Sequence, residues 1–266
     1  MSVNSYLEKL SSDLVLDTSE KNSISTSIET LEGRLSRHFG DDIKEKFCFG
    51  SYTRGTILPR KGDKQSDIDY MIVFNNDNQF KPQTFLDKLR AFAVKCYSTS
   101  EIHQSYPTII LRLNHINFEL VPAYDAAYYG NNYKIPAPNN EYEKWTSTDP
   151  NGFNIKLTDT NISNNSKIKP MIRLIKYWNT RNNHVYSSYS LEKHLINSNY
   201  SYLSTSLKDY FYDSVEGLVT WDLSSQTSID KVNKLKEKIN EIKQLENDNC
   251  PFTAETKIEE LLPNIN

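Results

Sequence analysis

The sequence reads GSYTRGT at residues 50–56 and SDIDYMIVF at residues 66–74, and these two stretches are the most informative part of the chain. The second stretch is dense in β-branched and aromatic residues, which predicts a strand over residues 68–74. Because side chains alternate between the faces of a strand, Asp67 and Asp69 are expected to project from the same face. The residues after this pair are apolar on both faces, which indicates a central strand with two carboxylates at its start.

The acidic pair predicts a site for a divalent cation. Two carboxylates on one face of a strand repel each other unless a cation lies between them. Mg²⁺ prefers oxygen ligands and is usually held by one or two carboxylates together with substrate phosphates. The alternative is an exposed strand whose two aspartates are simply solvated, and the pair by itself leaves both interpretations open.

A third carboxylate, Glu119, is available on a second predicted strand over residues 116–121. If this strand lies beside residues 68–74, Glu119 can join Asp67 and Asp69. Two metal ions would then be held, one activating an attacking hydroxyl and the other stabilising a leaving pyrophosphate. Considered without the other two carboxylates, Glu119 is better explained as a charged residue on the solvent-exposed face of a hairpin.

The Gly50-Ser51 pair predicts phosphate contacts at a turn from a strand into a helix. Glycine lets the backbone approach a phosphate closely, and the backbone N–H groups and the serine hydroxyl are donors. Gly-Ser pairs are common and mostly mark ordinary turns, so the value of this one comes from its place shortly before Asp67. Arg54 lies in the same stretch, and two roles stay open for it: it stabilises this loop, or it contacts a phosphate.

The remaining hydrophobic pattern predicts an α+β protein with two lobes. A tight hairpin is expected at Asn114-His115, and Pro122 is expected to limit the strand that follows. The other elements of the first half are helices over 24–39 and 85–97 and strands over 47–49 and 108–113. Residues 128–154 are expected to form an irregular crossover. Helices are then predicted over 170–181, 189–196, 201–212 and 229–246. The predicted domains are a catalytic core with N-terminal helices (1–125) and a helical lobe (126–266).

Composition limits the classes of protein that the chain can belong to. It has 31 Lys and Arg and 34 Asp and Glu, a formal net charge of −3, which argues against a general basic coat for nucleic acid. The three cysteines lie far apart, as in a cytosolic protein with reduced thiols, and the five histidines show no spacing typical of zinc ligands. We expect no signal peptide, no membrane span and a cytoplasmic location.

Three segments together resemble the polymerase-β-like nucleotidyltransferase superfamily: GSYTRGT, SDIDYMIVF and FELVPAY at residues 118–124. That superfamily has a Gly-Ser turn, an acidic-x-acidic strand and a third acidic residue on a neighbouring strand. The second half contains KPMIRLIKYW at 169–178 and SSYSLE at 187–192, which resemble the helical lobe of 2′-5′-oligoadenylate synthetases, cyclic GMP-AMP synthase and the bacterial CD-NTases. The resemblance implies a mixed-sheet core with flanking helices, a C-terminal helical lobe and an active site in the cleft between them.

The resemblance also implies roles for residues of the second half. The lysine matching Lys176 contacts the triphosphate, as does the serine matching Ser188, and the aromatic residue matching Tyr189 stacks on a base. The alternatives are that Lys176 belongs to a solvated basic stripe with Lys169 and Arg173, and that Tyr189 simply packs. The predicted site comprises catalytic and metal-binding Asp67, Asp69 and Glu119, and nucleotide-binding Gly50, Ser51, Arg54, Lys176, Ser188 and Tyr189.

The function implied is that of a Mg²⁺-dependent nucleotidyltransferase. It would join ribonucleoside triphosphates into a cyclic di- or trinucleotide and release pyrophosphate, using two Mg²⁺ ions, with Mn²⁺ as a substitute. The product would switch on a separate effector in bacterial anti-phage signalling. The chain lacks the Cys/His insertion of the animal DNA sensor and has no evident broad basic surface, so a nucleic-acid activator is not expected. We expect a monomer.

Two rival functions stay open. The first is another nucleotidyltransferase of the same superfamily, which adds nucleotides to tRNA 3′ ends or AMP to a protein; a tRNA enzyme would need an extended basic surface. The second is a catalytically inactive module that only binds nucleotides. The intact carboxylates of Asp67, Asp69 and Glu119 argue against the second.

Overall fold

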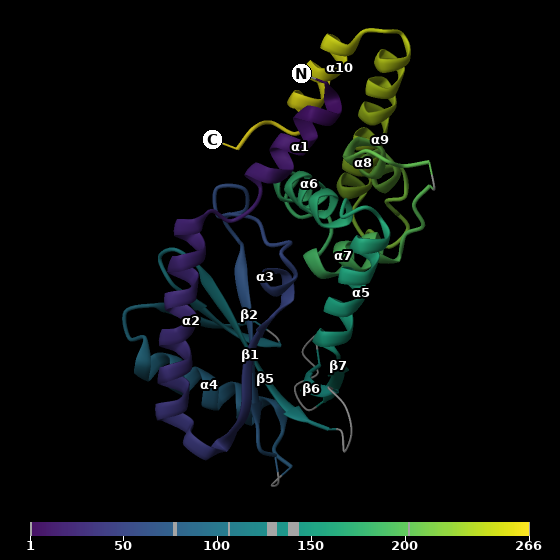
Figure 1. Cartoon of the computed structure of the whole chain (residues 1–266). Helices are drawn as coiled ribbons and strands as arrows, with labels where there is room; N and C mark the ends of the chain where they lie inside the picture. The colour runs from purple at the N-terminus through teal and green to yellow at the C-terminus, as the bar shows by residue number, and fades with distance from the viewer. Residues whose placement is uncertain are drawn as a thin grey trace. The chain divides into compact units, whose positions relative to one another are not determined.

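The structure is a computed structural model, and it describes residues 2–76, 79–105, 107–126, 132–137, 144–201 and 203–265 (Figure 1). The chain divides into two compact units, which we describe one at a time. The helical unit comprises Met1–Leu16, Lys61–Lys64 and Lys156–Asn266. The sheet unit comprises Asp17–Arg60 and Gln65–Ile155.

Within the described residues, the sheet unit contains a seven-stranded mixed sheet. Five strands lie in the order β1-β2-β5-β4-β3, β6 pairs with β5, and β7 pairs with β6. β2 and β5 are parallel, and the other pairs are antiparallel. The strands are β1 (Ile43–Phe49), β2 (Asp67–Phe74), β3 (Glu101–Ser105), β4 (Thr108–Arg112), β5 (Asn117–Asp125), β6 (Tyr133–Pro136) and β7 (Trp145–Thr148). The central position predicted for the strand over 68–74 is confirmed, since β2 lies between β1 and β5.

Two long helices of the sheet unit lie against one face of the sheet (Figure 1). They are α2 (Thr18–Phe39) and α4 (Pro82–Cys96). α2 begins at a capping box, in which Asp17 and Glu20 each accept a hydrogen bond from the other's backbone N–H. The buried Tyr70 of β2 points to this face, because its hydroxyl donates to Glu32 Oε1 of α2 at 3.0 Å. The 3₁₀ helix η1 (Gly40–Asp42) joins α2 to β1, and α3 (Gly50–Arg54) follows β1.

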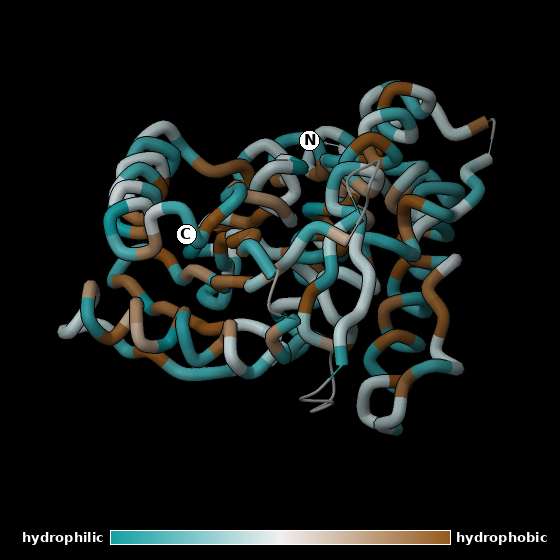
Figure 2. Tube along the Cα trace, turned by 90° about the horizontal axis from the view of Figure 1, so that it is seen from below, coloured by the Kyte–Doolittle hydropathy of each residue, from teal (hydrophilic) through white to brown (hydrophobic). Residues whose placement is uncertain are grey.

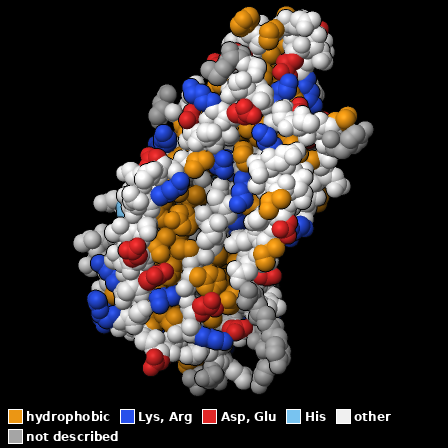
Figure 3. Space-filling model, in the orientation of Figure 1, with side chains coloured by type: hydrophobic (Ala, Val, Ile, Leu, Met, Phe, Trp, Pro, Cys, Tyr) orange, Lys and Arg blue, Asp and Glu red, His pale blue; other side chains and the backbone are white. Residues whose placement is uncertain are grey.

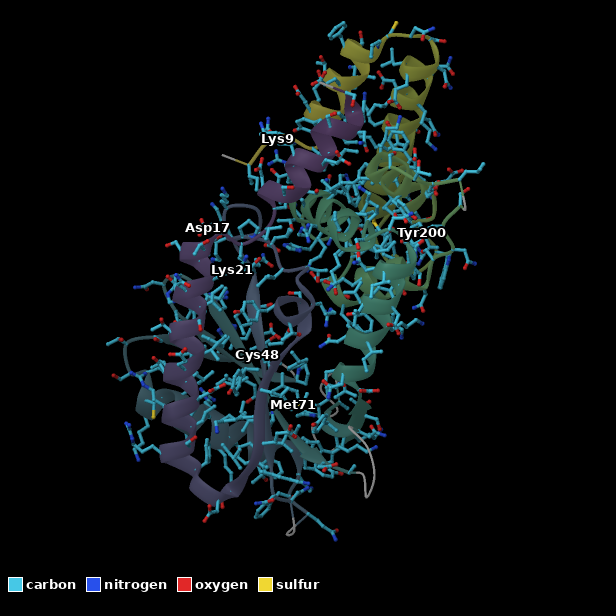
Figure 4. All side chains as sticks on the ribbon, in the orientation of Figure 1. Lys9, Asp17, Lys21, Cys48, Met71 and Tyr200 are labelled. Atoms are coloured by element: carbon cyan, nitrogen blue, oxygen red, sulfur yellow. The ribbon has the colours of Figure 1, made fainter. Side chains whose placement is uncertain are left out.

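The other face of β2 is acidic at the start of the strand and apolar toward its end. Met71 and Val73 are buried with Ala123 of β5 and Tyr133 of β6 in an apolar cluster, while Asp67 and Asp69 precede them on the same face. Figure 4 labels Met71, together with Cys48 of the neighbouring strand β1. β6 therefore covers one end of this face, and the carboxylates occupy the other end.

The helical unit is an assembly of amphipathic helices. It contains α1 (Val3–Asp13), the last part of α5 (Pro150–Ser163), α6 (Ile168–Arg181), α7 (Ser188–Asn197), α8 (Leu207–Glu216), α9 (Gln226–Asn247) and α10 (Pro251–Leu261). α1 packs on α6, α8 and α10, and the Tyr6 hydroxyl of α1 donates to Leu262 O at 2.6 Å. Hydrophobic and hydrophilic residues alternate along the helices in Figure 2, as the 3.6-residue period requires.

The structure differs from the predicted domain boundary at residue 125. The division falls after Ile155, because β5 pairs with β6 and β6 with β7, so that the sheet continues through residues predicted as an irregular crossover. Residues 127–131 and 138–143 of that stretch lie outside the described residues. The predicted core also included the N-terminal helices, whereas α1 belongs to the helical unit because its apolar side is buried against helices.

Several predicted element boundaries differ from the structure, and two of the differences have a clear physical reason. Pro122 does not end its strand: β5 runs to Asp125, and its pairing with β4 stops at Leu120, before the residue that lacks an N–H donor. The helix predicted over 201–212 begins at Leu207, because Ser206 caps its N-terminus in a capping box with Asp209.

In the described parts of the chain, no helix is both long and apolar enough to cross a membrane. On the face drawn in Figure 3, Lys and Arg side chains are interspersed with Asp and Glu.

Candidate active site

Three carboxylates gather where β2 and β5 begin. The parallel register places Asp69 opposite Glu119, and Asp67 opposite Asn117. Residues opposite each other on adjacent strands point to the same face, so Glu119 lies on the face that carries Asp67 and Asp69. All three residues are partly buried. The adjacency of the two strands, on which the prediction for Glu119 depended, is confirmed.

The electrostatics of this group show a shortage of positive charge. Burial, the negative charges of Asp67 and Asp69, and a hydrogen bond with Asp67 together raise the pKa of Glu119 to about 8, and burial contributes most. A carboxyl group with such a pKa keeps its proton near neutral pH. The three side chains thus share a site in which one of them stays protonated unless a cation binds.

The donor set suits a hard divalent cation. Across the described ranges, no group of three or more His, Cys, Asp or Glu side chains is arranged so that it could hold a metal ion. Mg²⁺ does not require such a group, since it usually takes one or two carboxylates and completes its shell with water and substrate phosphates. The carboxylate oxygens and the raised pKa of Glu119 both fit an ion of this kind.

The raised pKa of Glu119 predicts how stability depends on pH. The side chain ionises near 4.5 when unfolded and near 8 when folded, so between these values the folded state binds the extra proton. Stability contributed by this group is therefore complete below about pH 4.5 and is lost as the pH rises through 8. With a chelator present, raising the pH from 5 to about 8.5 should lower the melting temperature more for the wild-type protein than for Glu119→Gln. Parallel curves for the two proteins would contradict the raised pKa.

Gly50 makes room for Asp69. The strand-to-helix turn predicted at Gly50-Ser51 is present, since β1 ends at Phe49 and α3 begins at Gly50. Gly50 has φ +75°, and a Cβ at this position would lie 1.7 Å from Asp69 Oδ2. Only glycine combines this backbone conformation with so close an approach of a carboxylate.

Gly50→Ala should therefore disturb the acidic group directly. We expect a loss of about 1–3 kcal/mol in stability from the backbone conformation, and a fall of about a hundredfold in kcat/KM because Asp69 must move by about 1 Å or more. Gly55→Ala is the matched control: Gly55 has φ +70°, but an added Cβ would meet nothing within 4 Å. Equal losses of activity in both variants would show that strain, and not displacement of Asp69, is responsible.

Arg54 holds the turn to the start of α5. Its side chain is buried, and its guanidinium lies 4.8 Å from the centre of the Phe153 ring. The next residue of α5, Asn154, donates to Thr53 Oγ1 at 3.4 Å. Of the two roles left open for Arg54, these contacts favour the one in which it stabilises the Gly-Ser turn.

Lys176 lies in the helical unit and is not part of a solvated stripe. Its side chain is only 5% exposed, and its Nζ lies 3.0 Å from Oε1 of the fully buried Glu192 of α7. Arg173, one turn earlier, is also buried and donates from Nε to the Ser11 carbonyl at 3.1 Å. The solvated alternative is therefore wrong, while contact with a nucleotide stays a prediction. For that contact, Lys176 would have to share its ammonium group between Glu192 and a phosphate.

Ser188 and Tyr189 lie at the start of α7 in the helical unit. Ser187 caps the helix, accepting a hydrogen bond from the Ser190 N–H, and Ser188 is the first helical residue. Both Ser188 and Tyr189 are exposed, Tyr189 to 57%. Tight packing of Tyr189 in the core, the alternative interpretation, is wrong, and stacking on a base stays a prediction.

Two buried polar residues of the helical unit were not among the predicted site residues. Glu192 is the last residue of SSYSLE at 187–192, and Asn179 directly follows KPMIRLIKYW at 169–178. Asn179 lies three residues after Lys176, on the same side of α6. This spacing was the available signal, but burial of an Asn and a Glu is visible only in the structure.

Comparison with known proteins gives a family match over the first 161 residues. Residues 1–161 match the model of the Second Messenger Oligonucleotide or Dinucleotide Synthetase domain. Among curated proteins, a probable cyclic nucleotide synthase of Bacillus cereus is 27% identical over 241 aligned positions, which cover 70% of this chain and 71% of the relative. A cyclic AMP-AMP-AMP synthase of Acinetobacter is 26% identical over 179 positions, which cover 65% of this chain and about half, 51%, of that protein.

Solved structures show the same fold. The cyclic AMP-GMP synthase DncV of Vibrio cholerae, in complex with a linear intermediate, superposes with a TM-score of 0.74 at 13% identity, covering 96% of this chain and 93% of DncV. CdnC of Escherichia coli, with ATP, gives a TM-score of 0.72 at 13% identity and covers 98% of both chains. The α+β architecture, with its mixed sheet and flanking helices, is therefore the one predicted from the sequence.

Proposed function

The chain belongs to the Second Messenger Oligonucleotide or Dinucleotide Synthetase family, and we propose that it joins ribonucleoside triphosphates into a cyclic di- or trinucleotide, releasing pyrophosphate. As a member of this family it is a nucleotidyltransferase and a cyclic oligonucleotide synthase. The curated relatives, a probable cyclic nucleotide synthase and a cyclic AMP-AMP-AMP synthase, support this activity.

The observation that carries the proposal is the gathering of Asp67, Asp69 and Glu119 on one face of two parallel strands. These carboxylates supply the oxygen ligands for divalent metal, on which the family depends. We propose two Mg²⁺ ions, with Mn²⁺ as a substitute. When bound, such ions polarise the attacking hydroxyl and neutralise the charge that develops on the leaving pyrophosphate.

The other residues position the nucleotides. In this proposal Gly50 and Ser51 bring the backbone close to a phosphate, and Arg54 keeps their turn in place through Phe153. Ser188 hydrogen-bonds the triphosphate, and the exposed ring of Tyr189 stacks on a base. Lys176 stabilises α7 through its buried ion pair with Glu192, and it contacts a phosphate only if its ammonium group is shared between Glu192 and that phosphate.

The biological setting is part of the same proposal. We propose that the product acts as a second messenger in bacterial anti-phage defence and reaches a separate effector by diffusion. The substrates are nucleoside triphosphates, and the cytoplasm, where these are abundant, is the proposed location.

Product analysis tests the proposed function. Purified protein incubated with Mg²⁺ and all four ribonucleoside triphosphates should release pyrophosphate and form a cyclic oligonucleotide that mass spectrometry identifies. Omission of single triphosphates should then show which bases are used. Linear products alone, or transfer of AMP to protein, would replace the proposal with another nucleotidyltransferase activity, and nucleotide binding without turnover would indicate an inactive module.

A further inference from the structure

A buried asparagine of α6 holds the chain where it enters α7. The side chain of Asn179 is 1% exposed and forms two hydrogen bonds with the backbone of Tyr186. Asn179 Nδ2 donates to the Tyr186 carbonyl at 2.9 Å, and the Tyr186 N–H donates to Asn179 Oδ1 at 2.9 Å. The amide group therefore pairs with both the N–H and the carbonyl of one residue, in the way that a neighbouring strand would, which fixes both position and orientation.

α6 also holds α7 on the other side of its first turn. Lys176, three residues before Asn179 and on the same side of α6, forms its buried ion pair with Glu192. Tyr186 precedes Ser188 and Tyr189 in the chain, and Glu192 follows them. The turn that carries these two residues is thus held at both ends by α6.

The connection between the two helices contains two residues in the left-handed conformation. Asn183 and His184 have φ values of +62° and +50°, which are uncommon for residues other than glycine, although Asn and His adopt them more readily than most. The Asn179 carbonyl accepts hydrogen bonds from the N–H groups of Asn182 at 3.1 Å and His184 at 2.8 Å. Strained backbone persists where its surroundings over-determine it, and Asn179 supplies both backbone and side-chain contacts to this connection.

We propose that Asn179 is a positioning residue for nucleotide binding. Its side chain fixes the first turn of α7, and through that turn it presents the exposed Ser188 and Tyr189 in one orientation. A ligand then binds without having to order this turn, which increases affinity. The inference rests on the proposed function, because it takes Ser188 and Tyr189 to contact a nucleoside triphosphate.

Asn179→Ala should weaken nucleotide binding more than it slows the reaction. We expect KM for the triphosphate to rise about three- to tenfold, the effect of about one net hydrogen bond, while kcat changes by less than about twofold. Asn182→Ala is the matched control, because the hydrogen bond that it removes, from Asn182 Nδ2 to the Trp178 carbonyl, lies within α6 and does not involve α7. It should leave KM unchanged.

A double-mutant cycle distinguishes positioning from general stabilisation. In a Tyr189→Ala background, Asn179→Ala should raise KM by much less than in the wild type, since the ring that it positions is gone. A purely structural role would lower the melting temperature in both backgrounds and leave KM unchanged in both. That result would overturn the proposal.

Hydrogen exchange measured by mass spectrometry tests the same contact without activity. Amides of residues 186–191 should exchange faster in Asn179→Ala than in the wild type or Asn182→Ala, while α9 exchanges as before. If Asn179→Ala does not fold, Asn179→Ser takes its place in every measurement, because serine adds no buried charge and its single hydroxyl cannot replace both hydrogen bonds to Tyr186. Unchanged exchange, or an unchanged KM in an active enzyme, overturns the proposal. Faster exchange in a protein whose wild type makes no product would instead refute the proposed function, and with it the role of this turn in nucleotide binding.

Discussion

Replacing Asp67 and Asp69 together by asparagine should abolish pyrophosphate release and leave a folded protein. Asparagine keeps the shape of both side chains but removes the charges that would hold a divalent cation. Metal ions contribute several kcal/mol to stabilising such a transition state, so we expect kcat/KM to fall by about a thousandfold or more. Pyrophosphate release, measured at saturating Mg²⁺, checks this expectation.

The same double variant, although inactive, should be at least as stable to heat as the wild type in the absence of metal. Without metal the two aspartates repel each other and keep Glu119 protonated, so the double variant should unfold at the same or a higher temperature than the wild type when a chelator is present. Asp41→Asn with Asp42→Asn is a control for net charge, because both residues are exposed in η1. Wild-type turnover in a folded Asp67/Asp69 double variant would exclude these carboxylates from catalysis.

Lys176→Met should be among the most destabilising single changes in the helical unit. It leaves the carboxylate of Glu192 fully buried without the ammonium group that lies 3.0 Å away. Breaking a buried ion pair from one side costs about 3–5 kcal/mol, a large fraction of the stability of an ordinary domain. Chemical denaturation, with both proteins extrapolated to water, measures the difference.

A second replacement shows whether the buried charge is responsible. Lys176→Met combined with Glu192→Leu should recover most of the lost stability, because well-packed apolar residues often replace a buried ion pair without loss. The double variant should still bind nucleotide poorly if the pair helps to position α7. Lys238→Met, at an exposed pair with Glu241, should not change the free energy of unfolding measurably. A small effect of Lys176→Met would show that Glu192 is satisfied by other contacts.

Much of the sheet unit could be predicted because its signals are local. The alternation of Asp67, Ile68, Asp69 and Tyr70 follows from strand geometry, and the apolar run after them requires burial on both faces. The placement of Glu119 needed one long-range fact, that β5 lies beside β2, and the resemblance to a known superfamily supplied it; the parallel direction of the pair came only from the structure. The continuation of β5 past Pro122 depends on where the partner strand β4 stops, which no local pattern encodes.

The roles of buried polar residues were harder to predict. Lys176 and Arg173 form a basic stripe in sequence, and such stripes usually face solvent. Here each meets a buried partner that is distant in sequence, Glu192 for Lys176 and the Ser11 carbonyl for Arg173. A helical pattern predicts which face of the helix carries a side chain, but the packing of neighbouring helices determines whether that face is buried or exposed to solvent.

The placement of α1 in the helical unit has a consequence for protein synthesis. Residues 3–13 leave the ribosome early, but α6, one of the helices that α1 packs on, begins only at Ile168. At about 5–20 residues per second, the apolar side of α1 waits on the order of ten seconds for its first partner. Throughout that interval Tyr6, Leu7 and Leu10, which are buried in the finished protein, are available to chaperones and to other nascent chains. Substitutions on this side of α1 should therefore lower the yield of folded protein in the cell as well as the stability of the folded protein.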